Sequence, residues 1–145
     1  MSYALDVNVL LYASDEASPH HPRARAFLDE CAAGSEVMCL GWLTLMAYLR
    51  IATHPRVFGR PLSPGAAIAN VEALLALPMV RALAEEEGFW TSYRRVTGPV
   101  PARGNLVPDA HLAALLLQHD VRVLYTNDRD FRKFDFLETR NPFDA

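Results

Sequence analysis

Lysine is almost absent from this sequence. Lys133 is the single lysine among 14 basic residues, which face 17 acidic ones and leave a formal net charge of −3. This balance lacks the positive excess that indicates nucleic-acid binding, although arginine suits bidentate contacts to phosphate better than lysine does. The basic residues must therefore be judged by their positions rather than by their number.

Cysteine is scarce as well, with only Cys31 and Cys39. Small domains stapled by disulfides carry more cysteines, so we expect two buried free thiols in a cytosolic protein, with an oxidised pair as the alternative. The longest apolar runs stay well below the roughly 18 residues that cross a membrane. The opening MSYALDVNVLLYASDE lacks the basic stretch of a signal peptide, so we expect a cytoplasmic protein without membrane attachment.

The composition indicates a globular protein with a proper core. Apolar residues make up 51% of the 145 residues and charged residues 21%. No repeat, low-complexity tract or long linker divides the chain, so we predict a single domain over residues 1–145.

Buried strands and helices alternate along the chain. Runs of apolar residues predict strands, and apolar residues at helical spacing predict helices. The predicted strands cover 3–7, 36–41, 79–84 and 121–126, with a weak edge strand at 138–140. The predicted helices cover 20–33, 42–54, a segment opening at Ser63-Pro64, 88–96 and 108–119. This alternation predicts an α/β fold with a central parallel sheet flanked by helices, in which ligands bind beyond the carboxyl ends of the strands.

Four aspartates are expected at that edge of the sheet. Asp6 ends or nearly ends the first predicted strand, Asp128 and Asp130 follow the last clear strand, and Asp109 lies in the first turn of an apolar helix predicted to begin at Pro108. Each has an ordinary structural explanation, as a helix cap or as the partner of a buried arginine. Packed together, however, four carboxylates repel and take up protons unless a cation lies among them. A hard cation with oxygen ligands, Mg²⁺ or Mn²⁺, meets that need.

Four stretches of the sequence form a familiar set: LDVNVLLYA, YLRIATHPRVFGRPLSP (48–64), GNLVPDAHLAALLLQH (104–119) and TNDRDF (126–131). Together they resemble the PIN-domain ribonucleases, and most closely the VapC toxins of the mycobacterial subgroup. The resemblance runs from about residue 3 to the C-terminus. It implies a three-layer α/β/α sandwich, a homodimer, Mg²⁺- or Mn²⁺-dependent cleavage of structured RNA such as tRNA or rRNA, and a VapB-type antitoxin partner.

The resemblance also assigns roles to individual residues. Asp6 and Asp109 match the principal metal ligands of the family, and Asp128 matches a later acidic ligand that often works through water. Asp130 is a further acidic candidate. Two small polar residues match positions that orient the carboxylates, Asn8 and Thr126.

One position departs from the family pattern. Many PIN domains carry a glutamate just before the aromatic-Leu-Arg of the third helix, where this chain has Ala47. This favours one well-bound metal, with a second ion recruited by RNA phosphate. It also keeps open a catalytically weak PIN-fold module that binds RNA or the antitoxin without turnover.

The arginines gather in three places, although solvated helix faces would explain the same grouping. The groups are Arg50, Arg56 and Arg60; Arg94, Arg95 and Arg103; and Arg129 and Arg132 with Lys133. We expect Arg50, Arg56 and Arg103 to hold the RNA backbone.

Two other enzyme classes fit the sequence less well. A metal-free ribonuclease needs two histidines together, and nothing places two of the five in one site. A phosphatase of the haloacid-dehalogenase kind needs a second aspartate where Asn8 stands. The large residues Trp42, Met46, Met79 and Trp90 are assigned to the core rather than to a base-stacking surface.

Overall fold

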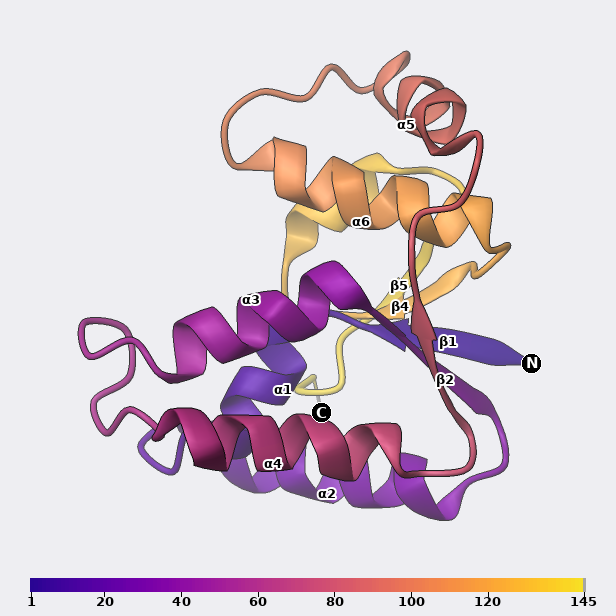
Figure 1. The fold of residues 1–145 in the computed structure, drawn as a ribbon. Coiled ribbons are helices and arrows are strands. Elements are labelled where there is room, and N and C mark those ends of the chain that lie inside the picture. The colour runs from indigo at the N-terminus through magenta and orange to yellow at the C-terminus, as the bar shows by residue number, and fades with distance from the viewer. Residues whose placement is uncertain (145) are drawn as a thin grey trace.

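A computed structural model describes residues 1–144, which contain one five-stranded sheet (Figure 1). The strands lie in the order β3-β2-β1-β4-β5, and every neighbouring pair is parallel. Their bounds are β1 Ser2–Leu5, β2 Val37–Gly41, β3 Val80–Leu83, β4 Val123–Tyr125 and β5 Glu138–Arg140. The predicted parallel sheet is confirmed, including its weak edge strand.

Helices cover both faces of the sheet, as Figure 1 shows with α5 and α6 on the opposite side from α2 and α4. Residues of α1 to α4 share one hydrophobic cluster, and residues of α5 and α6 share the other. The helices are α1 Val7–Ser14, α2 His21–Ala33, α3 Trp42–Ala52, α4 Pro64–Leu75, α5 Phe89–Thr97 and α6 Leu106–Gln118, followed by the short 3₁₀ helix η1 Arg129–Lys133. The predicted three-layer α/β/α sandwich is confirmed.

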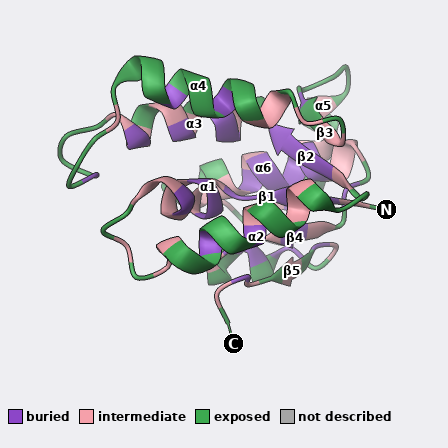
Figure 2. Cartoon of the chain, turned by 90° about the horizontal axis from the view of Figure 1, so that it is seen from below, coloured by how far each residue is buried: buried purple, intermediate pink, exposed green. Residues whose placement is uncertain are grey.

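Alternation along β1 divides the core between the two faces. Tyr3 and Leu5 pack into the cluster of α1 to α4, whereas Ala4 packs into the cluster of α6. Successive side chains of a strand point to opposite faces, so a strand buried on both sides reads as a continuous apolar run. Figure 2 shows the result, with buried strands at the centre and exposed outer surfaces on α2 and α4.

The first strand ends two residues earlier than predicted, and the sequence analysis missed the helix that follows it. Asp6 caps α1, because its Oδ1 accepts a hydrogen bond of 2.7 Å from the Val7 backbone N–H. The helix buries Val9, Leu10 and Ala13. The β-branched residues of VNVLLY favour a strand locally, and this preference hides the helical spacing.

Helix α6 begins at Leu106, and the prediction that it begins at Pro108 is wrong. Pro108 is the third helical residue, a position whose backbone N–H has no partner within the helix, so proline is tolerated there. Asp109 still lies in the first turn, as predicted. The helix buries Ala110 and the run 112–116, in agreement with its apolar sequence.

The assignment of four large residues to the core is wrong for three of them. Trp42 is 41% exposed, Met46 50% and Trp90 67%, while Met79 is half-buried. Helix α3 turns a neighbouring stripe inward instead, and its buried residues are Thr44, Leu45, Tyr48 and Ala52.

Both cysteines carry free thiols, as predicted, although only Cys39 is buried and Cys31 is half-buried. Within residues 1–144, no helix combines the length and the apolar character needed to cross a membrane.

Candidate functional site

The carboxyl ends of β1 and β4 lie side by side at the point where the sheet order reverses. β1 pairs with β2 on one side and with β4 on the other, and all run in parallel. The chain leaves β1 toward the helices of one face, whereas β4 is reached from α6 on the other face. Ligands of parallel α/β folds bind at such reversals.

Asp6 is the first polar residue at this point and is only 9% exposed. Its Oδ2 accepts hydrogen bonds from the Thr126 hydroxyl at 2.8 Å and from the Asn8 amide at 3.3 Å, in addition to the Val7 N–H on Oδ1. These donors keep the buried carboxylate satisfied, so the alternative of a buried arginine partner does not apply.

Thr126 connects the ends of the two strands. Its hydroxyl oxygen donates to Asp6 and accepts hydrogen bonds from the Asp128 backbone N–H at 2.9 Å and from the Asn8 amide at 3.3 Å. Asn8 in turn accepts a hydrogen bond from the Asn127 backbone N–H at 3.4 Å. Asn8 and Thr126 therefore both contact the carboxylate of Asp6, one of the groups that the resemblance expects them to orient.

Three carboxylates meet beside this network. Asp109, Asp128 and Asp130 each offer an oxygen within 4.8 Å of the others. Asp6 lies outside that set, and Lys133 approaches Asp130 at 3.5 Å. The structure thus brings Asp109 and Asp128 together with Asp130, whereas Asp6 is not one of the three residues of this set.

Two of the four aspartates have raised pKa values. The pKa of Asp109 is raised to about 7, mainly by burial and in addition by the charges of Asp128, Asp6 and Asp130, against a lowering by Lys133. Burial also raises the pKa of Asp6, with hydrogen bonds from Thr126 and Val7 opposing the shift and the charge of Asp128 adding to it.

These shifts fit a cation site. Carboxylates that resist carrying charge together become fully charged when a divalent cation lies among them, and oxygen ligands suit Mg²⁺ and Mn²⁺. Within residues 1–144, the carboxylates of Asp109, Asp128 and Asp130 lie close enough together to share such an ion.

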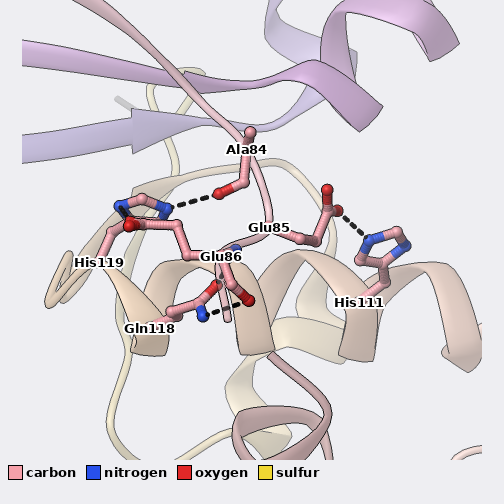
Figure 3. A network of polar contacts seen from close by, with 6 residues as sticks. All are labelled: Ala84, Glu85, Glu86, His111, Gln118 and His119. Atoms are coloured by element: carbon pink, nitrogen blue, oxygen red, sulfur yellow. Dashed lines mark hydrogen bonds and ion pairs between the residues drawn. The ribbon is translucent and has the colours of Figure 1, made fainter. Parts of the chain in front are cut away.

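A polar network holds α6, and with it Asp109, against the segment that follows β3 (Figure 3). Gln118 accepts a hydrogen bond from the Glu86 backbone N–H and donates to the carbonyls of Glu86 and Glu87, at 3.0 to 3.2 Å. His119 lies 2.8 Å from the Ala84 carbonyl oxygen. These contacts join both ends of the β3–α5 connection to the C-terminal half of α6.

His111 completes this network rather than the acidic site. Its Nε2 lies 2.6 Å from Glu85 Oε1, and Figure 3 shows both side chains on the same side of α6. This hydrogen bond lowers the pKa of Glu85.

Comparison with known proteins decides the family. The sequence matches the profile described as the PIN domain over residues 3–137. The chain is a PIN-domain protein. The resemblance inferred from the residues is confirmed.

Relatives of this PIN domain include ribonucleases of the VapC group. The chain is 46% identical to ribonuclease VapC48 of Mycobacterium tuberculosis over 143 residues, which cover 99% of each protein. It is 38% identical to ribonuclease VapC43 of the same species over 141 residues, 97% of this chain and 95% of that one.

Solved structures of low sequence identity share the fold. VapBC2 from Rickettsia felis, bound to a DNA fragment from its promoter, superposes with a TM-score of 0.71 at 15% identity and covers 97% of this chain and 98% of its own. Mycobacterium tuberculosis VapC20, described as a toxin that cleaves the sarcin-ricin loop, gives 0.69 at 17% identity and covers 95% and 98%.

The arginines expected to hold RNA lie outside the aspartate cluster of this PIN domain. Arg50 is in the last turn of α3, Arg56 follows that helix, and Arg103 precedes α6; all three are exposed. Within residues 1–144, none of the three side chains forms an ion pair with a carboxylate. Ala47 is half-buried on α3, where many PIN domains have glutamate.

A cavity in the N-terminal part of the chain lies away from the four aspartates of the site. It has a volume of about 500 Å³ between α1, α2 and α4, and its lining includes Leu10, Leu28 and Leu74. None of the four aspartates of the site lines it, so its size does not make it the site of chemistry.

Two asparagines belong to the surroundings of the site although the sequence analysis did not select them. Asn141 donates a hydrogen bond of 2.9 Å to Oδ1 of Asn127, and Asn127 contacts the Tyr12 hydroxyl at 3.4 Å. Asn127 lies between Thr126 and Asp128, which the sequence had already indicated as site residues, so its position could have identified it. Asn141 lies 14 positions further on, and no local pattern marks it.

Proposed function

We propose that this PIN domain is a Mg²⁺- or Mn²⁺-dependent endoribonuclease that cleaves structured RNA, tRNA or rRNA, as the cytoplasmic toxin of a VapBC-type pair. The observation that carries the proposal is the cluster of Asp109, Asp128 and Asp130 beside the buried Asp6, at the reversal of the sheet. The names of the VapC relatives support it, because those proteins are ribonucleases at 38% to 46% identity.

Asp6, Asp109 and Asp128 are the proposed catalytic and metal-binding residues, with Asp130 as an additional ligand. A divalent ion bound there would polarise the phosphate and lower the pKa of an attacking water. Thr126 and Asn8 hold Asp6 in one orientation through their hydrogen bonds, and Thr126 also fixes the backbone of Asp128.

The attacking group proposed for this site is water rather than the RNA 2′-hydroxyl. Cleavage should then leave a 5′-phosphate and a 3′-hydroxyl, and it should also act on a substrate whose 2′-hydroxyl at the cleaved position is replaced by hydrogen. A cyclic 2′,3′-phosphate end would contradict this part of the proposal.

Incubation of the purified chain with total RNA tests the function. We expect cleavage with Mn²⁺, none with EDTA, and a large loss in Asp109→Asn, which removes one charge at nearly constant volume. Asp135→Asn is the matched control, because Asp135 is exposed and outside the cluster. Cleavage that persists in EDTA or in Asp109→Asn would overturn the proposal.

The second candidate is a PIN-fold module that binds RNA or an antitoxin without turnover. Ala47 favours it, because a site lacking the usual glutamate has one carboxylate fewer for a second ion. Tight RNA binding by the wild-type chain without cleavage, in Mn²⁺ and over a range of tRNA and rRNA substrates, would select this candidate.

We further propose a VapB-type antitoxin as partner and a homodimer as the free state. The descriptions of the structural neighbours support a partner of this kind, since VapBC2 was solved as a complex. Co-expression with the product of a small open reading frame directly upstream should give a stable complex, and light scattering should give twice the mass of 16.2 kDa for the free chain.

A further inference from the structure

A small polar pocket adjoins the aspartate cluster on the side of the C-terminal tail. Its volume is about 160 Å³, and its walls come from the end of β4, from η1, from β5 and from the tail. Asp128 belongs both to this pocket and to the cluster, so the two sites share a wall. The lining residues that the argument uses are Asn127, Asp128, Arg129, Arg132, Arg140 and Asn141.

Two of the three arginines in this pocket have free donor groups. Arg140 pairs with Glu138 and donates a hydrogen bond of 3.2 Å to the Tyr125 hydroxyl, so its guanidinium is largely committed. Arg129 and Arg132 are exposed, and within residues 1–144 neither forms an ion pair or a side-chain hydrogen bond. Among residues 1–144, the carboxylates that line the pocket are those of Asp128 and Asp144, and Asp144 is exposed.

The far wall of the pocket is built from a tail that is fixed in place. Arg23 donates a hydrogen bond of 2.8 Å to the Pro142 carbonyl oxygen. The ring of Phe143 lies 5.1 Å from that of Tyr12 and 4.7 Å from that of His20. Asn141 joins this anchored tail to Asn127, immediately before Asp128.

The side-chain amides of Asn127 and Asn141 already form hydrogen bonds within the protein, so the arginines determine which ligand the pocket binds. Asn141 donates to Asn127 and accepts from the Phe143 backbone N–H at 2.9 Å. An anion in the pocket would therefore be bound by the two unpaired guanidinium groups of Arg129 and Arg132, whereas a cation would be repelled by all three arginines. Guanidinium groups bind phosphate through two parallel hydrogen bonds, and phosphate contacts position RNA on proteins.

We propose that this pocket binds a phosphate group of the RNA strand next to the phosphodiester that is cleaved, with Arg129 and Arg132 as the donors. The inference rests on the proposed ribonuclease function and specifies how its substrate is held. A phosphate in this pocket places the neighbouring phosphodiester toward Asp128, the residue that the pocket and the cluster share.

RNA binding in EDTA tests the pocket separately from cleavage. The probe is a fluorescein-labelled 12-nucleotide single-stranded RNA of mixed sequence, measured by fluorescence anisotropy with the full chain. We expect the double variant Arg129→Gln/Arg132→Gln to bind at least about tenfold more weakly than wild type. The slope of log K against log salt should fall in magnitude by about 0.7 for each lost phosphate contact.

A matched control separates a local contact from the loss of charge. Arg25→Gln/Arg81→Gln removes two charges from exposed positions in α2 and β3, and within residues 1–144 neither of these arginines forms an ion pair, as is also true of Arg129 and Arg132. It should bind RNA within about twofold of wild type, and Arg129→Lys/Arg132→Lys should restore part of the affinity because charge returns without the bidentate geometry. Both double glutamine variants should keep the wild-type unfolding midpoint.

The possible outcomes separate a failure of the pocket proposal from a failure of the proposed function. If the wild type cleaves RNA in Mn²⁺ but both double glutamine variants bind RNA as tightly as the wild type does, the pocket proposal is wrong and the proposed function stands. An equal weakening in both doubles also overturns the pocket, because it would reflect net charge alone. If the wild type neither binds nor cleaves RNA, the proposed function fails and the pocket proposal fails with it.

Discussion

The hydroxyl of Thr126 donates a 2.8 Å hydrogen bond to Oδ2 of Asp6, across 120 positions of sequence. The two residues follow neighbouring parallel strands, so the pairing of β1 with β4 brings them together. Asp6 is thereby buried without a cationic partner, and Thr126 couples it to the backbone of Asp128.

Replacing Thr126 by valine should destabilise the protein. The change keeps the shape of the buried side chain, 3% exposed, but removes its hydrogen bonds with Asp6, Asn8 and Asp128. Leaving buried polar groups unpaired costs about 1–3 kcal/mol, which urea denaturation at pH 7 should detect. Thr139→Val is the control, because Thr139 is half-buried in β5; an equal loss there would contradict the role of the Thr126 hydroxyl.

In EDTA, the free energy of unfolding should fall as the pH rises from about 4 to about 7. The pKa of Asp109 is raised from 3.8 to about 7 in the folded state, so folding favours the protonated carboxyl. The unfolded state releases this proton first, and stability is therefore lost as the pH rises through the folded-state pKa.

Asp109→Asn should remove much of this pH dependence and should be more stable than wild type above pH 7. The measurement is urea unfolding at pH 5 and pH 8. Asp135→Asn should keep the wild-type dependence, since Asp135 is exposed and outside the cluster. An unchanged slope in Asp109→Asn would show that this carboxyl ionises normally.

Mn²⁺ should stabilise the folded chain, and more strongly at pH 8 than at pH 5.5. Ion and protons compete for the same carboxylates, so metal binding releases protons. At a free concentration of 100 times the dissociation constant the stabilisation is about 2.7 kcal/mol. Thermal unfolding of wild type and Asp109→Asn with and without Mn²⁺ measures it, and equal stabilisation of both would place the ion elsewhere.

Gln118→Ala should loosen the connection between β3 and α5. The substitution removes one hydrogen bond to the Glu86 N–H and two to the carbonyls of Glu86 and Glu87. We expect a loss of about 1 kcal/mol, because solvent replaces part of these contacts. Hydrogen exchange should accelerate at the Glu86 amide. Glu72→Ala on the exposed surface of α4 is the control and should change neither quantity.

Ala47→Glu should tighten Mn²⁺ binding if position 47 faces the site as the family pattern implies. A gain of roughly tenfold in affinity, about 1.4 kcal/mol, is the expected size. Ala47→Gln adds the same bulk without charge and should bind as wild type does. Calorimetric titration measures the Mn²⁺ affinity of both variants, and equal affinities would show that position 47 does not contribute to the metal site.

Local sequence determined the elements of this fold and most of its candidate site. The spacing of apolar residues is a property of each segment by itself, so the sheet and five of the six helices could be predicted. Strand ends in a parallel sheet share one edge, and this rule together with the family resemblance selected Asp6, Asp109 and Asp128.

Only the tertiary structure decided the rest, because the deciding contacts join residues far apart in the chain. Helix α1 was hidden by the β-prone run VNVLLY, and its cap is visible only once Asp6 is placed at the strand end. The inward stripe of α3 depends on what packs against it, which exposes Trp42 and Met46.

The neighbours of the carboxylates are decided in the same way. Thr126 reaches Asp6 through strand pairing, Asn141 reaches Asn127 through the anchored tail, and Asp130 joins Asp109 through the approach of η1 to α6. A sequence specifies which groups need a partner, since a buried charge must be satisfied. Which partner is found follows from the packing of strands and helices in three dimensions.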